Sequence, residues 1–355
     1  MTETTKDTSR LSANDIRVFR TENPKMRERD VAARLGLSEA ALVAAEVGIS
    51  ATRIDADVDR FLGRVASLGE ILALSRNESA VHEKIGVYEN IKSGVQAAIV
   101  LGENIDLRIF PKRWAHAFAV TKTDGDQQRL SLQFFDKAGD AVHKVHLRPA
   151  SNIEAYHEIV AELRLEDQSQ DFVEDRSGYD NGEIDGDVSR DELRDHWSRM
   201  TDTHQFFGML QKLKIGRQAA IRTVGDDYAW KLAPTAVAEM MHASVREGLP
   251  IMCFVANDGI VQIHSGPIFN VEAMGPWINI MDPTFHLHLR QDHIAEVWAV
   301  RKPTKEGHVT SLEAYNAKGE MIIQFFGKRK EGFEERGDWR VIVENLPKAD
   351  DSVAA

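Results

Sequence analysis

The spacing of hydrophobic and polar positions changes along the chain in a way that occurs twice. Residues 14–47 carry hydrophobic side chains at helical spacing, interrupted at Asn23-Pro24 and at Gly36. From about residue 70 the pattern becomes a series of short alternating runs separated by Gly, Asp and Asn turns. Strands that are joined by short turns, without intervening helices, pair antiparallel. The pattern therefore predicts a helical start followed by an antiparallel sheet with helices covering one face.

The alternating runs place the individual elements of the first unit. We expect strands at 97–101, 105–110, 116–121, 129–135 and 141–147, and a closing helix at 155–163. The second unit follows the same plan from residue 190 to about residue 346.

The two units also repeat each other in sequence. FAVTK at 118–122 matches WAVRK at 298–302, an offset of 180 residues, and IDLRIF at 105–110 lies opposite FHLHLR at 285–290. Self-similarity at a fixed offset marks a duplicated structural unit, here about 160 residues long. The sequence thus predicts an α+β fold, a tandem duplication of a unit with a large antiparallel sheet flanked by helices.

Most of the negative charge of the chain lies between these two units. The formal net charge of the 355 residues is −12. Residues 166–192 hold eleven acidic and two basic residues and so carry most of it. We interpret this Gly-containing stretch as an acidic linker. It would join an N-terminal repeat at 1–165 to a C-terminal repeat at 193–347, with a tail at 348–355.

Composition excludes several classes of protein. The single cysteine, Cys253, rules out a disulfide framework, and the acidic balance disfavours a general nucleic-acid binder. No apolar run reaches the ~18 residues of a membrane helix, and the N-terminus has no hydrophobic targeting segment, so we expect a cytoplasmic protein. The motifs GxxxxGK[ST], GxGxxG and GxSxG do not occur. An ordinary nucleotide-binding enzyme or α/β-hydrolase is therefore disfavoured.

Three local patterns allow both a functional and a structural interpretation. Residues 27–46 resemble a DNA-binding helix-turn-helix, but a structural helix hairpin explains them and the second repeat loses the pattern. Residues 181–192 place a glycine and a final glutamate as a calcium-binding EF-hand loop does, although a solvated linker is the simpler explanation. His286 and His288 alternate on a strand, so both project from one face as a metal pair or as ordinary surface histidines.

One further histidine has a more specific setting. His204, in TDTHQFFGML at 201–210, lies at the expected start of an apolar helix that Asp202 or Thr203 can cap. Histidine is the commonest metal ligand, yet a histidine at such a place is often structural. Basic residues that could accompany it are scattered through the sequence, and spacing alone does not bring them together.

Several longer strings carry a family resemblance. They are LALSRNESAVHEKIGVYENI (72–91), VLGENIDLRIFPKRW (100–114), TDTHQFFGML (201–210), QIHSGP (262–267), DPTFHLHLR (282–290), AEVWAVRKPTKEGHVTSLE (295–313) and QFFGKR (324–329). In these strings, in order and over nearly its whole length, the chain resembles the HemS/ChuS/HmuS family of haem-utilisation proteins, often called hemin-degrading factors. The resemblance implies a haem cleft between the two halves.

The resemblance also implies roles for individual residues. His204 would be the proximal ligand of the haem iron, and Arg108, with Phe110 beside it, would lie on the distal side as the candidate catalytic residue. Neutral imidazole is a common haem ligand, and two propionates call for Arg or Lys. The further haem-binding residues that the resemblance implies are Arg217, Lys302, Gln324 and Arg329.

Catalyst and carrier both remain open at this point. A protein that degrades haem to release iron would take electrons from outside, since no flavin or nicotinamide fingerprint is visible. A carrier would hold haem as cargo for a separate haem oxygenase. The resemblance implies haem as the bound group, an inner-membrane haem ABC transporter as donor and an external reductase or oxygenase as partner, without nucleic acid or membrane insertion.

Two roles are likewise left open by the residues themselves. Arg108 could stabilise charge in the reaction, or it could only close the pocket as a gate. His82, which lies at the position of His264 in the duplication, is the candidate ligand for a second haem in the first half.

Overall fold

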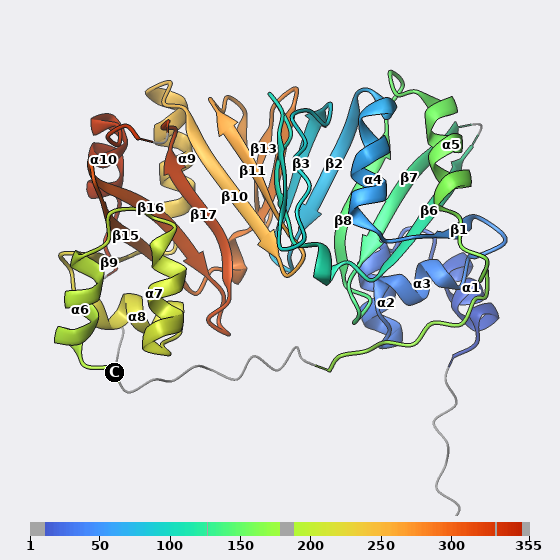
Figure 1. Ribbon diagram of the computed structural model, residues 1–355, viewed down its shortest axis with the longest axis horizontal. Helices are drawn as coiled ribbons and strands as arrows, with labels where there is room; N and C mark the ends of the chain where they lie inside the picture. Colours follow the sequence, from blue (N-terminus) through green and yellow to red (C-terminus); the bar gives the residue numbers. More distant parts are fainter. Residues whose placement is uncertain (1–10, 126, 178–187, 331, 350–355) are drawn as a thin grey trace, which may run out of the picture.

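Nearly the same order of helices and strands occurs twice in the chain, and the second half has one additional strand, β12 (Figure 1). The computed structural model describes residues 11–125, 127–177, 188–330 and 332–349. The first half contains α1 (Ala13–Glu22), α2 (Glu28–Leu35), α3 (Glu39–Ala44), β1 (Ala51–Ile54), α4 (Val58–Val65), β2 (Ile71–Arg76), β3 (Ala80–Gly86), β4 (Ala98–Leu101), β5 (Asp106–Ile109), β6 (His116–Asp124), β7 (Gln127–Phe135), β8 (Ala141–Leu147) and α5 (Ile153–Leu163). The second half contains α6 (Arg190–Ser198), α7 (Gln205–Leu213), α8 (Arg217–Val224), β9 (Ala229–Leu232), α9 (Ala236–Arg246), β10 (Ile251–Asn257), β11 (Ile260–Gly266), β12 (Val271–Met274), β13 (Trp277–Met281), β14 (Phe285–Arg290), β15 (Glu296–Thr304), β16 (Gly307–Tyr315), β17 (Met321–Gly327) and α10 (Gly337–Glu344).

The helical start of the first half has the boundaries that its sequence favours. Ser12 caps α1 by accepting the backbone N–H of Asp15, and Ser38 caps α3 by accepting that of Ala41. Gly36 ends α2 with a φ of 66°, which glycine adopts without steric cost. All six residues of α3 are buried. The second helix of the helix-turn-helix pattern therefore packs inside the protein, as the structural-hairpin interpretation requires.

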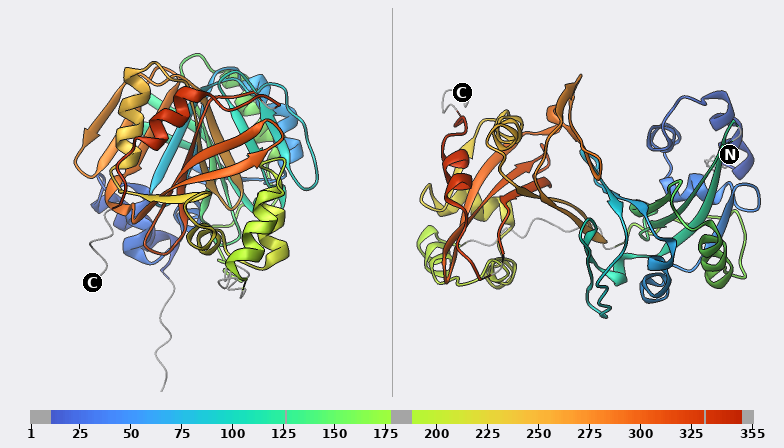
Figure 2. Two further views of the ribbon diagram at one scale, coloured as in Figure 1. Left: turned by 90° about the vertical axis from the view of Figure 1, so that its left-hand side faces the viewer. Right: turned by 90° about the horizontal axis from the view of Figure 1, so that it is seen from above.

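The strands form two antiparallel sheets, and each sheet contains strands from both halves. The nine-stranded sheet has the order β1-β6-β7-β8-β2-β3-β14-β13-β12, and the eight-stranded sheet the order β4-β5-β11-β10-β17-β16-β15-β9. The exchange occurs where β3 pairs with β14 and where β5 pairs with β11. Figure 2 shows strands of both halves meeting in the middle of the molecule. The predicted α+β duplication is confirmed, with the halves joined through their sheets as well as along the chain.

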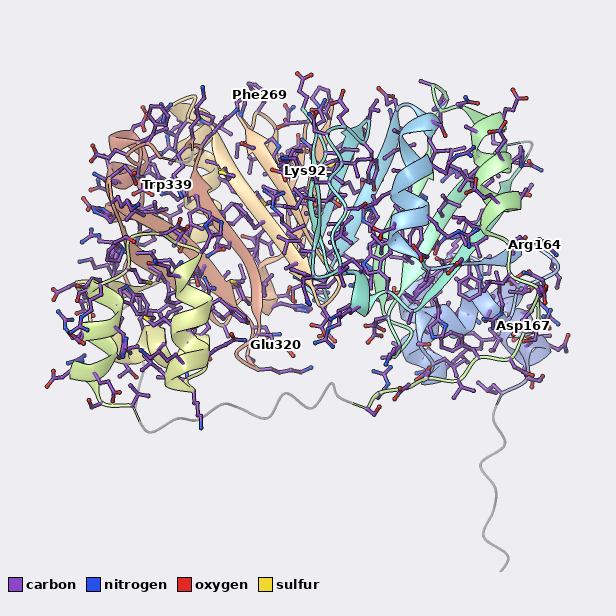
Figure 3. All side chains as sticks on the ribbon, in the orientation of Figure 1. Lys92, Arg164, Asp167, Phe269, Glu320 and Trp339 are labelled. Atoms are coloured by element: carbon purple, nitrogen blue, oxygen red, sulfur yellow. The ribbon has the colours of Figure 1, made fainter. Side chains whose placement is uncertain are left out.

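Helices cover both faces of the sheets. In the first half, Phe61 of α4 packs with Phe134 on one face, while α3 packs with Phe135 on the other. In the second half, α9 and α10 cover one face of the eight-stranded sheet and α6, α7 and α8 cover the other. Trp339 of α10 is fully buried there and donates its indole N–H to the Thr310 carbonyl at 2.9 Å (Figure 3). The expectation that one face is covered was wrong, because neighbouring strand residues such as Phe134 and Phe135 are both apolar and point to opposite faces.

Two asparagines in equivalent turns fasten the halves to each other. Asn77 follows β2, and its side-chain amide donates to the carbonyls of Ala256, at 3.2 Å, and Ile322, at 2.8 Å. Asn257 ends β10, and its amide donates to the carbonyls of Arg76, at 3.0 Å, and Val142, at 2.9 Å. Each asparagine therefore satisfies two backbone acceptors, both of them in the opposite half.

The beginning of the predicted acidic linker packs against the first half. The Arg53 guanidinium donates to the carbonyl of Ser169 at 2.8 Å, and Phe172 is 7 % exposed in the core beneath α3. Residues 178–187, with most of the calcium-loop pattern, and residues 350–355 of the tail lie outside the described residues. The domain boundaries stay a prediction. In the described part of the chain we find no helix with the length and apolar character that crossing a membrane requires.

Candidate functional site

The His204 side chain is exposed to solvent, and one of its two ring nitrogens is hydrogen-bonded. The residue is the N-cap of α7, and its side chain is 80 % exposed. Its Nδ1 lies 2.7 Å from the Oδ1 of Asp202, and the same oxygen accepts the His204 backbone N–H at 2.8 Å. A carboxylate acceptor at Nδ1 fixes the tautomer in which Nδ1 carries the proton. The Nε2 lone pair is then free to bind a metal.

The surroundings of His204 form a polar cavity of about 320 Å³. Asp202, Lys305, Glu306 and Arg329 line it together with His204. The backbone N–H and then the ring of His204 lower the pKa of Asp202, and Arg329 adds to this effect. Asp202 is therefore an anion that holds the imidazole, and the cavity beside it is lined by two cations, Lys305 and Arg329, and one further carboxylate, Glu306.

Three of the other predicted site residues meet at one carboxylate, that of Glu313 on β16. Glu313 has no exposed surface. Arg217 donates to it from Nε at 2.9 Å and from the second guanidinium nitrogen at 2.6 Å, and the Lys302 ammonium donates at 2.9 Å. We call the group the Glu313 cluster; its remaining donors to the carboxylate are Gln324 at 2.7 Å, Ser311 at 2.6 Å and Tyr315 at 2.6 Å.

The charges of the Glu313 cluster stabilise one another. Burial alone would raise the pKa of Glu313, but the attraction of Arg217 and Lys302 outweighs it and holds the pKa well below its usual value. Burial lowers the pKa of Lys302 to about 8, an effect that Glu313 partly offsets. At neutral pH the cluster thus holds one anion and two cations, a net charge of about +1.

Phe206 connects the Glu313 cluster to the helix that carries His204. The Arg217 guanidinium carbon lies 5.0 Å from the centre of the Phe206 ring, and the Lys302 ammonium lies 4.9 Å from it. Both are cation–π distances. Because Phe206 is two residues after His204, α7 holds the histidine next to the positively charged end of the sheet.

Arg108 lies on the face of the eight-stranded sheet that also carries the Glu313 cluster. Residues directly opposite each other in antiparallel strands point to the same face. The register joins Glu313 to Gln324, Gln324 to Phe254, Phe254 to Ile263 and Ile263 to Asp106. Asp106 and Arg108 are two residues apart on β5, so both belong to this face.

Helices cover only one end of this face. Trp298, Val300 and Tyr315 are buried beneath α6, α7 and α8. Further along, from β17 to β5, Ile263 is buried at 2 % exposure but most residues of the same face are half-buried. We call these half-buried residues the open face; they are Met252, Phe254, Val261, Gln324, Phe326 and Arg108. The rings of Phe254 and Phe326 lie 5.3 Å apart there. A flat apolar ligand would find aromatic contact on the open face, with His204 and the Glu313 cluster at its covered end.

Arg108 and Phe110 end the open face on the side of the first half. The Arg108 guanidinium donates to the carboxylate of Asp106 and, at 3.1 Å, to the carbonyl of Leu107. Its side chain is 35 % exposed, and Phe110 is 36 % exposed. The Asp106 contact restrains the guanidinium without removing it from solvent.

Other histidines have structural partners. His286 pairs with Glu83 at 3.1 Å, and His288 lies 2.7 Å from the Oδ1 of Asn279. Across the described ranges no group of three or more His, Cys, Asp and Glu side chains could hold a metal ion. His82 is fully buried with its ring 4.9 Å from that of Phe285, so it lies in the core and not at an opening.

The sequence analysis did not identify Asp202 as the hydrogen-bond acceptor of the His204 ring. It also did not identify Glu313 as a residue of the site. The signal for Glu313 was the charged residue in the apolar alternation of VTSLEAY, where a strand residue facing the interior requires cationic partners. Asp202 was considered only as a helix cap. The structure brings Arg217, Lys302 and Gln324 together and places Arg329 beside His204, while Arg108 and Phe110 lie at the other end of the open face.

A family model, the haemin-degrading HemS.ChuX domain, matches the chain twice, at residues 36–163 and 214–346. The chain belongs to this family. It is 38 % identical to the hemin transport protein HmuS of Yersinia pestis over 326 residues, which cover 92 % of this chain and 94 % of HmuS.

Two solved structures of family members are similar over their whole length. Holo-PhuS, a heme-binding protein from Pseudomonas aeruginosa, has a TM-score of 0.88 at 38 % identity, covering 95 % of this chain and 98 % of PhuS. ChuS, described as an E. coli heme oxygenase, has a TM-score of 0.83 at 35 % identity, covering 92 % and 98 %. The resemblance seen in the sequence strings is thus confirmed by sequence and by structure.

Proposed function

We propose that this protein binds haem on the open face and degrades it to release iron in haem-iron utilisation, in the cytoplasm. His204 binds the iron through Nε2, and Asp202 holds the ring through Nδ1. Lys302, Arg217, Gln324 and Arg329 supply the positive and amide groups that balance two propionates. Haem is the substrate, and a reductant and dioxygen come from outside the chain.

One observation carries this proposal. An exposed imidazole has a carboxylate at one ring nitrogen and a free second nitrogen, and it stands at the edge of a cavity lined by Arg329 and Lys305. This setting differs from that of His82, which has no exposed surface. Hydrogen bonding of the non-ligating nitrogen is the usual arrangement at metal-binding histidines.

Arg108 has the position and the chemistry to act on the reaction from the opposite end of the open face. A fixed guanidinium stabilises negative charge that develops near it, without a need to reorganise solvent. Asp106 keeps the guanidinium oriented. Burial raises the pKa of Asp106, and the neighbouring Arg108 offsets part of this rise.

The first experiment separates the enzyme from a carrier that delivers haem to another oxygenase. The protein is loaded with ferric haem under anaerobic conditions, and reductant and air are then added. The enzyme loses its Soret band and releases iron to a ferrous chelator. A protein that keeps its Soret band and passes haem to an added acceptor protein is a carrier, the second candidate function, which the name of HmuS as a transport protein favours.

Two substitutions test the residue roles. His204→Ala is expected to abolish the native ligand spectrum, whereas His242→Ala, an exposed histidine on α9 behind the sheet, leaves it unchanged. An unchanged spectrum in His204→Ala would reject the ligand assignment. Arg108→Ala should slow haem breakdown far more than it weakens haem binding. Equal losses of breakdown rate and of affinity would mean that Arg108 only closes the site.

The transporter and reductase partners belong to this proposal and are to be sought by co-purification.

A further inference from the structure

A groove of about 790 Å³ lies between α9 and α10, the helices that cover the eight-stranded sheet on the side opposite to the open face. The two helices lie next to each other at the outer end of the second half (Figure 1). Ala243, Ile342 and Leu346 are the apolar, more buried residues of the groove, and Val341 lines it while being 59 % exposed. The groove is therefore separate from the proposed haem site.

The matching helices of the first half, α4 and α5, are joined by ion pairs. The Arg64 guanidinium on α4 donates to Glu158 at 3.0 Å and to Glu162 at 2.9 Å on α5. The residue 180 positions after Arg64 is Ser244, which has no exposed surface. Among the described residues no ion pair joins α9 to α10. The second half therefore lacks the bridge that closes the same place in the first half.

Four residues of α9 form a stripe along this groove, with the spacing of one helix face: Glu239, His242, Ala243 and Arg246. The three polar side chains of the stripe are exposed, and in the part of the chain that the structure describes they have no hydrogen bond or ion pair. Glu239 and Arg246 are seven residues apart, which is ~10 Å along the helix. Two opposite charges on either side of a small residue are thus without a partner in this chain.

The stripe is complementary to a second copy of itself. If two α9 helices pack antiparallel about a twofold axis between His242 and Ala243, Glu239 of each copy opposes Arg246 of the other. His242 of each copy then opposes the small Ala243 of the other, which lets the helix axes approach to roughly 8–10 Å. In such a symmetric contact every pair occurs twice.

We propose that the groove side of α9 is the contact surface of a homodimer, in which α9 packs antiparallel against α9 of a second copy of this chain. Two Glu239–Arg246 ion pairs flank the axis, and the exposed Val341 adds apolar surface beside them. Exposed ion pairs contribute little each and are screened by salt, so the dimer is weak, reversible and salt-dependent. A second copy fits better than a foreign helix, because the order of acidic, small and basic residues matches its own reversal. The open face stays accessible in both copies, since it lies on the other side of the sheet.

Sedimentation equilibrium of the full, haem-free chain at low salt tests the proposal without depending on haem binding. The wild-type protein should pass from monomer to dimer as its concentration rises, and added salt should weaken the dimer. Glu239→Lys turns both ion pairs into contacts between two cations, and Arg246→Glu turns them into contacts between two anions. Each variant should weaken the dimer roughly 10–100-fold.

A mixture of these two variants separates a lost contact from a damaged fold. In a dimer of one Glu239→Lys chain and one Arg246→Glu chain, opposite charges face each other again at both ends of the stripe. The mixture should therefore dimerise, although neither variant does so alone, and the combined variant should dimerise by itself. Glu22→Lys is the matched control: it makes the same charge change at an exposed residue of α1 and should keep the wild-type dimer.

Three results would overturn the proposal. The first is a wild-type protein that stays monomeric up to about 1 mM, a concentration that populates even a weak dimer. The second is a dimer that persists unchanged in both single variants, because its contact then lies elsewhere. The third is a mixture of the two variants that stays monomeric.

Discussion

Glu313→Gln removes the charge of the Glu313 cluster and keeps the shape of the side chain. In the wild-type protein the two carboxylate oxygens accept six hydrogen bonds, four at Oε1 and two at Oε2. An amide offers one acceptor oxygen, and its NH2 group would face donors. If the amide oxygen takes the place of Oε1, the NH2 group meets the Arg217 Nε and the Tyr315 hydroxyl.

The expected cost follows from the burial of the partners. Removing one member of a buried ion pair typically costs about 3–5 kcal/mol, because the other charge stays buried without compensation. Lys302 is 3 % exposed at its side chain, whereas that of Arg217 is 29 % exposed and can recover some hydration. We therefore expect a loss of about 3 kcal/mol in the free energy of unfolding, a large part of the ~5–15 kcal/mol of a typical domain.

Urea unfolding of the haem-free protein, followed by tryptophan fluorescence, measures this loss. Glu320→Gln is the control, since Glu320 is exposed at the lower edge of the second half (Figure 3) and should change stability by no more than about 0.5 kcal/mol. Adding Lys302→Met to Glu313→Gln should recover part of the loss, because it removes one uncompensated cation. A loss below about 1 kcal/mol in Glu313→Gln would refute the view that Arg217 and Lys302 depend on this carboxylate.

Three further predictions concern other contacts. Because the folded-state pKa of Glu313 is depressed, the ionised carboxylate contributes fully to stability above its usual pKa, and this contribution is lost as the pH falls below about 4.5. The free energy of unfolding should therefore fall less steeply with decreasing pH in Glu313→Gln than in the wild-type protein. Equal slopes in the two proteins would contradict the assignment. Asp202→Asn should weaken haem binding by roughly 10–100-fold, because the His204 ring loses its carboxylate acceptor. Haem titration measures the affinity, and the ligand spectrum should change with it. An unchanged affinity would mean that Asp202 does not tune the imidazole. Asn257→Ala should cost about 1–3 kcal/mol in urea unfolding, since two carbonyls of the first half lose their donor, and a change under 0.5 kcal/mol would mean that water replaces it.

The sequence by itself determined the repetition and many of the local elements, although β1 and α4 were not expected from it. Ser12, Gly36 and Ser38 set helix ends through interactions with residues at most five positions away, so the boundaries of α1, α2 and α3 could be read from short segments. The strand at 141–147 is also correct to the residue. The strings around His204 and Arg108 led to the family because they are long enough to be specific.

The tertiary structure alone decided which strands are neighbours and which side chains meet. The pairing of β3 with β14 joins residues about two hundred positions apart, and hydrophobic alternation is the same whichever partner a strand has. Arg217, Lys302 and Gln324 were assigned to the ligand by resemblance, but their common attachment to Glu313 depends on the register between β16 and β17 and on the packing of α8.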